Sequence, residues 1–114
     1  QLMTSRLISI TPSASVKEAI GKMKKHKISQ LPVIDSNKLV GLVSESTILD
    51  ALLKSKSKIV REVMQEAPPI VSKTTSIQVV SNLLKHYPIV VVSEEGRLVG
   101  LITKSDLLGK LYKS

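Results

Sequence analysis

The feature that most constrains this chain is a pattern that occurs twice, 59 residues apart. Residues 39–49 read Leu-Val-Gly-Leu-Val-Ser-Glu-Ser-Thr-Ile-Leu, and residues 98–108 read Leu-Val-Gly-Leu-Ile-Thr-Lys-Ser-Asp-Leu-Leu. Each copy predicts a short apolar strand that contains a glycine and is followed at once by the polar start of a helix. A repeat of this length indicates duplicated supersecondary units, so the chain is expected to consist of two similar halves.

Hydrophobic spacing and turn residues predict the elements of the first half. We expect a strand at 6–10, a helix from Val16 to His26 or Lys27, strands at 31–34 and 39–43, and a helix at about 45–54. The turn at 11–15 supplies the N-cap of the first helix, and the turn at 35–38 joins the two strands as an antiparallel hairpin. Pro32 predicts an edge strand or the start of a strand.

The second half repeats this order after a helical turn at 59–64. We expect a strand at 70–72, a helix that buries Ile77, Val80 and Leu84, a strand at 89–92, a turn at 93–96, a strand at 98–102 and a helix from 104 to about 111. The fold class is therefore α/β in the broad, mixed α+β sense, with two β-α-β-β-α repeats. The expected boundaries are 1–54 for the first repeat, 55–63 for a linker and lead-in, and 64–114 for the second repeat.

The halves differ between the helix and the strand that follows it. Val16 and Pro32 are 16 residues apart, whereas Ile77 and the matching Val90 are 13 residues apart. The second half is expected to lack about one turn of connection, so any pockets lined by these connections are not equivalent. The chain also begins in mid-pattern without an initiator Met, and we expect it to be a piece of a longer protein whose other part carries the output.

Composition narrows the possible function classes. The net charge of +8 raises the possibility of nucleic-acid binding, but the basic residues are spread along the chain, and the lack of Phe and Trp weakens a base-stacking surface. The absence of cysteine excludes disulfides and cysteine-ligated zinc and fits a reducing compartment. No apolar run is long enough to span a membrane, so we expect a soluble, cytoplasmic chain.

Catalysis has little support in the sequence. His26 and His86 each stand alone, without a metal-binding spacing, and neither a Gly-rich phosphate loop nor a nucleophile elbow occurs. We therefore expect no enzyme activity, no catalytic residue, no metal and no required cofactor.

The start of the last helix is the strongest candidate site. Thr103 is expected as its N-cap, with Asp106 three residues later. The N-terminus of a helix favours phosphate or carboxylate, and the Asp106 carboxylate can accept hydrogen bonds from a vicinal diol. The same spacing also fits a capping box, in which both side chains only satisfy the helix end, so both interpretations stay open. In the first half, Ser44 and Thr47 can cap a helix but offer no carboxylate.

The repeated pattern, the strand Leu31-Pro32-Val33-Ile34-Asp35, and Val60-Arg61-Glu62-Val63-Met64 ahead of the second half occur in one order along the chain. In this the chain resembles a tandem cystathionine β-synthase (CBS) domain pair, over essentially its whole length. The shortened second half resembles the CBS pairs of archaeal helix-turn-helix regulators and of cystathionine β-synthase regulatory tails. The resemblance implies two repeats packed through their sheets with pseudo-twofold symmetry. It also implies two clefts for adenosine-containing ligands such as AMP, ADP, ATP or S-adenosylmethionine.

The resemblance also implies which residues line the clefts. In the principal cleft Asp106 would hold the ribose and Thr103 the phosphate, and the full set is Met3, Ile8, Ser29, Gln30, Thr103, Lys104, Ser105 and Asp106. In the second cleft Thr47 replaces the ribose-binding Asp, so this cleft is expected to be weak or empty. Its residues would be Ser44, Thr47, Met64, Pro69, Tyr87 and Pro88.

The sequence therefore predicts a regulatory module that senses an adenosine-containing small molecule and controls an attached domain or partner. We expect the effector domain to lie outside this fragment, no membrane partner, and a homodimer formed through the CBS modules. One alternative is a ligand-free dimerisation scaffold that uses apolar helix residues, namely Ile48, Leu49, Leu52, Leu107, Leu108 and Leu111. The other alternative is a basic nucleic-acid-binding module.

Overall fold

The computed structural model describes residues 7–54 and 58–111 of the chain, with only the backbone of Lys110 and Leu111. The described residues form two compact units. The N-terminal unit is Ile8–Ala67, and the C-terminal unit comprises the described residues from Pro68 onward together with Leu7. In this part of the chain no helix is both long enough and apolar enough to cross a membrane.

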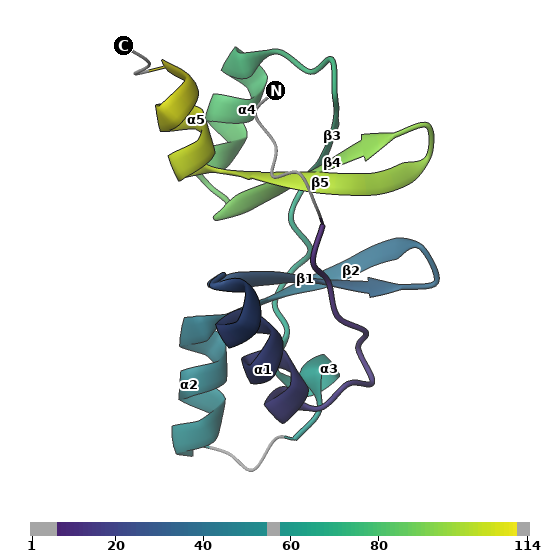
Figure 1. Cartoon of the computed structure of the whole chain (residues 1–114), viewed down its shortest axis with the longest axis vertical. Helices are drawn as coiled ribbons and strands as arrows, with labels where there is room; N and C mark the ends of the chain where they lie inside the picture. The colour runs from purple at the N-terminus through teal and green to yellow at the C-terminus, as the bar shows by residue number, and fades with distance from the viewer. Residues whose placement is uncertain (1–6, 55–57, 112–114) are drawn as a thin grey trace. The chain divides into compact units, whose positions relative to one another are not determined.

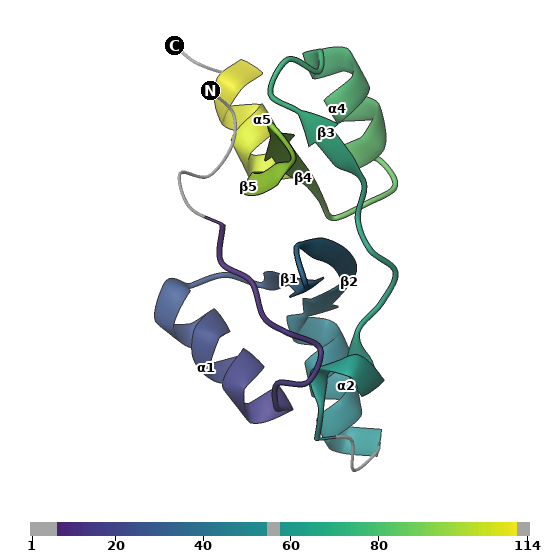
Figure 2. The same ribbon diagram turned by 90° about the vertical axis from the view of Figure 1, so that its right-hand side faces the viewer.

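The N-terminal unit is a β-hairpin covered by helices. Its elements are α1 (Val16–His26), β1 (Gln30–Asp35), β2 (Lys38–Ser44), α2 (Glu45–Lys54) and α3 (Val60–Val63). Figures 1 and 2 show α1 and α2 on the same side of the hairpin. Between the helices and the hairpin lies an aliphatic core that includes Ala19, Met23, Val33, Val43 and Ile48.

The C-terminal unit has a third strand. Its elements are β3 (Ile70–Ser72), α4 (Ile77–Leu84), β4 (Ile89–Glu94), β5 (Arg97–Thr103) and α5 (Lys104–Leu111). The strand order is β3-β4-β5, with β3 parallel and β5 antiparallel to the central β4. Both helices lie on one side of this sheet (Figure 1), and the core includes Val80, Leu84, Val90, Ile102 and Leu107.

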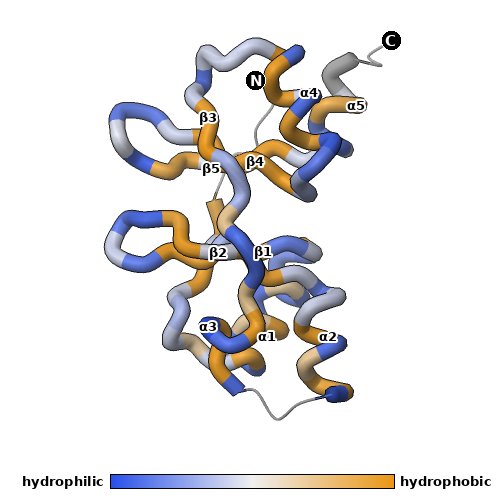
Figure 3. The backbone as a smooth tube through the Cα atoms, turned by 180° about the vertical axis from the view of Figure 1, so that it is seen from behind, coloured by the Kyte–Doolittle hydropathy of each residue, from blue (hydrophilic) through white to orange (hydrophobic). Residues whose placement is uncertain are grey.

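The two hairpins are alike in register and in turn. Val33 pairs with Gly41 in one hairpin and Val92 with Gly100 in the other, and the register shifts directly after each pair. Each turn places two consecutive residues at positive φ, 50° and 69° at Ser36 and Asn37 and 51° and 79° at Glu95 and Gly96. Two such residues characterise the tight turns that follow the natural twist of paired strands. Figure 3 shows these turns as hydrophilic and the strands as largely hydrophobic.

Most predicted elements are confirmed, and α1 shows why. The side chain of Ser15 caps the helix by accepting a hydrogen bond from the Glu18 N–H at 2.9 Å. Residues at helical spacing, Val16, Ala19 and Met23, are buried. Lys27 ends the helix in the left-handed conformation with φ of 55°, which is a common helix stop.

The strand predicted at 6–10 is wrong in its extent. Arg6 lies outside the described residues, and among residues 7–10 only Ile10 pairs, in a single parallel bridge to Val33. β1 is therefore an edge of its two-stranded sheet, as Pro32 predicted. Pro32 lies opposite Leu42, whose N–H and C=O bond to Gln65 instead. A residue without an N–H therefore costs no hydrogen bond at this position.

Two further predictions about the second half need correction. Ile77 is 36% exposed rather than buried, because it is the first residue of α4. The second repeat was also predicted to have a shorter connection between its helix and β4, and this prediction is wrong. α1 has 11 residues and α4 has 8, whereas 27–29 and 85–88 connect them to their strands. The second repeat is therefore shortened in its helix.

The described part of the predicted linker belongs to the N-terminal unit. Lys58 C=O accepts from Val16 N–H at 2.8 Å, and Val60 N–H donates to Ala14 C=O at 2.8 Å. The side chain of Val60 is fully buried in the core of this unit. Residues 55–57 lie outside the described residues.

Gly41 lets the chain after α3 lie directly against β2. A Cβ atom at this position would lie 2.8 Å from Sδ of Met64 and 2.9 Å from the carbonyl oxygen of Gln65. The Gln65 carbonyl is fixed by its hydrogen bond from Leu42 N–H at 3.1 Å. A side chain at position 41 would therefore force the backbone apart.

We predict that Gly41→Ala lowers the free energy of unfolding by about 1–3 kcal/mol, the usual cost of overpacking a closed site. Gly21→Ala is the matched control, since Gly21 is an exposed position inside α1 with nothing within 4 Å of the added Cβ. That substitution should raise stability by about 0.5–1 kcal/mol, because alanine favours helix more than glycine does. Urea unfolding followed by circular dichroism measures both, and equal effects would contradict the role assigned to Gly41.

Candidate ligand site

The candidate site lies where β5 passes into α5 with no residue between them. Thr103 ends the strand, and its side-chain Oγ1 accepts a hydrogen bond from Asp106 N–H at 3.2 Å. In return, Asp106 Oδ2 accepts from Thr103 N–H at 2.9 Å. The two residues therefore form a reciprocal capping box, which was one of the two interpretations of this spacing in the sequence.

The capping box leaves other groups of this helix end open to a ligand. It uses Oδ2 of Asp106, which leaves the second carboxylate oxygen as an acceptor. Lys104 and Ser105 are exposed in the first turn of α5, where backbone N–H groups have no acceptor within the helix. A carboxylate acceptor beside the positive end of a helix dipole suits a ligand that carries both hydroxyl groups and an anion.

The equivalent junction between β2 and α2 has the same reciprocal pattern of hydrogen bonds but a different chemistry. Ser44 N–H donates to Thr47 Oγ1 at 3.0 Å, and Thr47 N–H donates to Ser44 Oγ at 3.3 Å. Thr47 Oγ1 also donates to the Ser44 carbonyl at 3.0 Å, and Ser44 Oγ lies 3.0 Å from Ser46 Oγ. These hydroxyl groups satisfy one another and supply no negative charge.

Three other predicted residues lie in the N-terminal unit. Ser29 is exposed, and its carbonyl accepts from Glu45 N–H at 3.1 Å. Gln30 is the register partner of Ser44, and its Oε1 is buried without a hydrogen-bond partner among the described residues. Ile8 is partly buried against the core. Within this unit the loop before β1 therefore lies beside the start of α2.

The remaining predicted residues are held mainly by backbone contacts and packing. Met64 packs on Gly41 in the N-terminal unit. In the C-terminal unit the Pro69 carbonyl accepts from Val91 N–H at 2.9 Å, and Tyr87 N–H donates to Leu83 C=O at 3.0 Å. Pro88 is exposed and directly precedes Ile89, the register partner of Thr103. Met3 lies outside the described residues.

Sequence reasoning missed a polar groove in the N-terminal unit. It has a volume of about 320 Å³ and is lined by Thr47, Asp50, Ala51, Lys54, Glu62, Val63 and Gln65. Asp50 and Lys54 form an ion pair of 3.1 Å on α2. The groove joins α2 to residues 62–65, at the end of the predicted linker and just after it, and no local pattern in the sequence indicates that contact. In the described part of the chain no cluster of three or more His, Cys, Asp or Glu side chains could hold a metal ion.

Comparison with known proteins agrees with the duplication. The family model for the CBS domain matches the chain twice, over residues 1–54 and 60–113. The chain is 36% identical over 104 residues to an inosine-5'-monophosphate dehydrogenase of Korarchaeum cryptofilum, covering 89% of this chain and 21% of that protein. It is 35% identical over 107 residues to the zinc metalloprotease MJ0392 of Methanocaldococcus jannaschii, covering 94% of this chain and 30% of that protein. The chain thus spans only a fifth to a third of these relatives.

Solved structures of similar size share the fold. One is the CBS domain pair of protein MJ0100 in complex with 5'-methylthioadenosine and S-adenosyl-L-methionine, with a TM-score of 0.84, 26% identity and coverage of 97% of this chain and 95% of that chain. Another is CBSX2 in complex with AMP, with a TM-score of 0.79, 27% identity and coverage of 97% and 91%. From the double match and this shared fold, the chain belongs to the CBS domain family and carries two copies of the domain.

Proposed function

We propose that the chain is a regulatory module that binds an adenosine-containing ligand at the junction of β5 and α5. The observation that carries the proposal is the capping box, in which Asp106 Oδ2 accepts from Thr103 N–H at 2.9 Å and the carboxylate is thereby held beside the N-terminus of α5. The carboxylate would accept hydrogen bonds from the ribose hydroxyls. Thr103 and the first-turn N–H groups would face the anionic or polar part of the ligand.

The ligands of the structural relatives favour this chemistry. CBSX2 was solved with AMP, and MJ0100 with 5'-methylthioadenosine and S-adenosyl-L-methionine. These molecules differ in the group attached to the ribose but share adenosine. The proposed ligand class is therefore AMP, ADP, ATP or S-adenosylmethionine, with the adenosine part recognised in every case.

Residues of the other repeat are proposed to take part on the basis of the family resemblance. Met3, Ile8, Ser29 and Gln30 are assigned to the same ligand, alongside Lys104 and Ser105. The buried Oε1 of Gln30, which has no partner among the described residues, supports a role for this side chain. A buried oxygen without a hydrogen bond is costly, and a donor such as an adenine amino group would satisfy it.

The second site, around Ser44 and Thr47, is proposed to bind the ligand weakly or not at all. The Thr47 hydroxyl already accepts from Ser44 N–H and donates to the Ser44 carbonyl. Ribose hydroxyls would therefore have to displace existing hydrogen bonds. Thr47 has no carboxylate to compensate for that loss. Met64, Pro69, Tyr87 and Pro88 remain the other residues proposed for this site.

A regulatory output requires that the ligand distinguish two states of the protein. A ligand that binds both states equally changes neither population. We propose that the module acts on a domain or partner outside this chain, and that it has no catalytic role of its own. The two relatives described above support this proposal, since both are named as enzymes and the match covers only 21% of the dehydrogenase and 30% of the metalloprotease.

We predict that Asp106→Ala weakens binding of the adenosyl ligand about 10- to 100-fold, because a hydrogen bond to a charged group contributes about 1.5–3 kcal/mol. The measurement is a calorimetric titration of the chain with AMP, ATP, S-adenosylmethionine and a short DNA duplex at two salt concentrations. Thr47→Ala, at the equivalent position of the other repeat, is the control and should leave the principal affinity unchanged. Equal weakening by both variants would contradict the assignment.

Asp106→Asn separates the ligand role from the capping role. The Asn amide oxygen can still accept from Thr103 N–H, so we predict a loss of at most about 1 kcal/mol in unfolding free energy, mainly from the helix dipole. Asp106→Ala removes the acceptor and should cost about 0.5–2 kcal/mol. Binding should nevertheless fall in both variants, because neither retains the carboxylate. Wild-type affinity in Asp106→Asn would show that the charge is not used.

The same titration distinguishes the other functions considered. If no adenosyl ligand binds while the chain forms a stable dimer, the scaffold function would replace the proposal. If only the duplex binds, with an affinity that falls steeply as salt rises, the nucleic-acid function would replace it.

A further inference from the structure

Lys22 of α1 holds the segment that precedes this helix. Its Nζ donates a hydrogen bond of 2.7 Å to the Ser9 carbonyl, and both residues are partly buried. Ser9 belongs to residues 7–10, which we call the 7–10 segment. It directly follows Ile8, which the proposed function assigns to the ligand. A lysine of one element is therefore bonded to the backbone next to a proposed ligand-binding residue of another.

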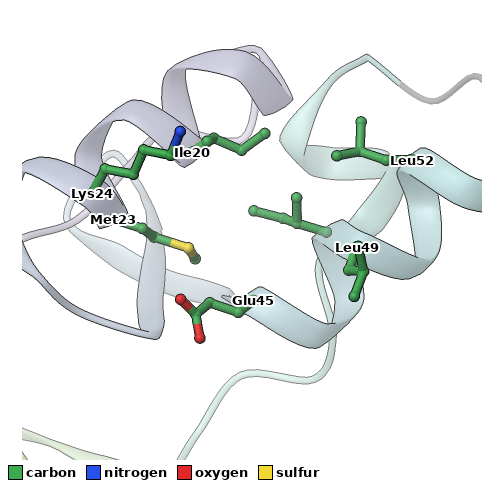
Figure 4. Close-up of a pocket in the computed structure, with 7 residues that line it drawn as sticks. Ile20, Met23, Lys24, Glu45, Leu49 and Leu52 are labelled. Carbon is green, nitrogen blue, oxygen red and sulfur yellow. The ribbon is translucent and has the colours of Figure 1, made fainter.

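Other lysines of α1 make no comparable contact. Lys17 and Lys25 are exposed and have no hydrogen bond or ion pair from their side chains among the described residues. Lys24 lines a groove of about 410 Å³ between α1 and α2, and Figure 4 shows it on the α1 side of this groove. The contact of Lys22 with the 7–10 segment is therefore specific to its position and is not a general property of a basic helix.

The second repeat contains an equivalent of the 7–10 segment. Two parallel pairs align the segments that precede the helices, namely Ile10 with Val33 and Val71 with Val92. In each hairpin the paired valine directly precedes the register shift. The 7–10 segment is therefore equivalent to residues 68–71, and the backbone hydrogen bonds of the two segments can be compared residue by residue.

One hydrogen bond of the second repeat is missing from the first. Val91 N–H donates to the Pro69 carbonyl at 2.9 Å. The first repeat has Pro32 at the position of Val91 and Ile8 at the position of Pro69, and proline has no N–H to donate. The missing donor costs nothing within the hairpin. On the side that faces the 7–10 segment, however, it leaves the Ile8 carbonyl without a hydrogen bond among the described residues.

Lys22 supplies a hydrogen bond close to this interruption. The two ladder bonds of the 7–10 segment are both made by its last residue, since Ile10 donates to the Pro32 carbonyl at 3.0 Å and accepts from Ile34 N–H at 2.9 Å. The bond from Lys22 is made one residue earlier. A charged donor forms a stronger hydrogen bond than a neutral one, so the amine compensates for the bond that proline cannot make.

An apolar residue replaces Lys22 in the second repeat. Alignment of the N-caps Ser15 and Ser76 places Leu83 at this position. Leu83 packs against the core of its unit, and the segment before α4 forms β3, a regular strand that pairs through three residues. A regular ladder and a leucine therefore occur together in one repeat, and an interrupted ladder and a lysine in the other.

We propose that Lys22 is a positioning residue for the adenosine-containing ligand, an inference that rests on the proposed function. Lys22 acts through the backbone of Ser9 and holds Ile8 in the position that the ligand requires. Without this hydrogen bond the 7–10 segment would leave β1 for part of the time. The apparent affinity would then fall in proportion to the fraction of molecules in which the segment stays in place.

Amide hydrogen exchange without ligand, followed by NMR, tests the holding role. Lys22→Leu should speed exchange at the Ile10 and Ile34 amides about tenfold, because a hydrogen bond from a charged group contributes at least that factor. Lys25→Leu makes the same change of charge at an exposed lysine of the same helix and should leave both amides protected. Unchanged protection in Lys22→Leu, or equal loss in Lys25→Leu, would overturn the proposal.

A double variant transfers the arrangement of the second repeat to the first. Lys22→Leu/Pro32→Val introduces the residues found at the positions of Leu83 and Val91, and it supplies an N–H that can donate to the Ile8 carbonyl. We expect it to restore the protection that Lys22→Leu loses. A double variant that exchanges as fast as Lys22→Leu would show that Lys22 does not compensate for the missing ladder bond. Circular dichroism of each variant verifies that it is folded.

Calorimetric titration with AMP, ATP and S-adenosylmethionine tests the role in binding. A ligand that binds the wild type should bind Lys22→Leu about tenfold more weakly and Lys25→Leu with unchanged affinity. Lys22→Arg retains a charged donor and should recover the affinity. Weakening by Asp106→Ala but not by Lys22→Leu would overturn the role of Lys22 alone, whereas a wild type that binds none of the three would refute the proposed function itself.

Discussion

The direct passage from a β-strand into an α-helix is the constraint on which both repeats depend. β2 passes into α2, and β5 into α5, with no residue between them. A helix that starts at the end of a strand has no loop to satisfy its first N–H groups, so side chains within the first turn must do so. In one repeat hydroxyl groups meet this need, and in the other a threonine and a carboxylate do.

This constraint explains how a duplicated fold can carry unequal functions. The backbone tolerates any pair of side chains that caps the helix, so Thr47 and Asp106 are structurally equivalent. Their remaining hydrogen-bonding capacity is not equivalent, because a carboxylate has an oxygen left over and a threonine hydroxyl already donates to a carbonyl. Capping and ligand recognition are therefore compatible properties of one residue rather than competing explanations for it.

Much of the fold could be predicted because its signals are local. The apolar spacing of Val16, Ala19 and Met23 defined α1, and the polar turns defined the hairpins. The first strand was mispredicted, since pairing of Ile10 depends on a distant partner, Val33. The shortening of the second repeat was assigned to the wrong element. The number of residues between the start of a helix and the next strand does not show whether the helix or the connection is shorter. The capping box at Thr103 and Asp106 was predicted as one of two interpretations. The polar groove beside α2 was not predicted, because it depends on the spatial approach of segments that are separate in sequence.

The attachment of residues 58–67 to the N-terminal unit has a consequence for how such a chain evolves. The family match to the second repeat begins at residue 60, yet Val60 completes the core of the unit that precedes it. The segment inherited with one repeat thus folds with the other. An exchange of whole repeats at the boundary of the family match would therefore replace a core residue of the first unit.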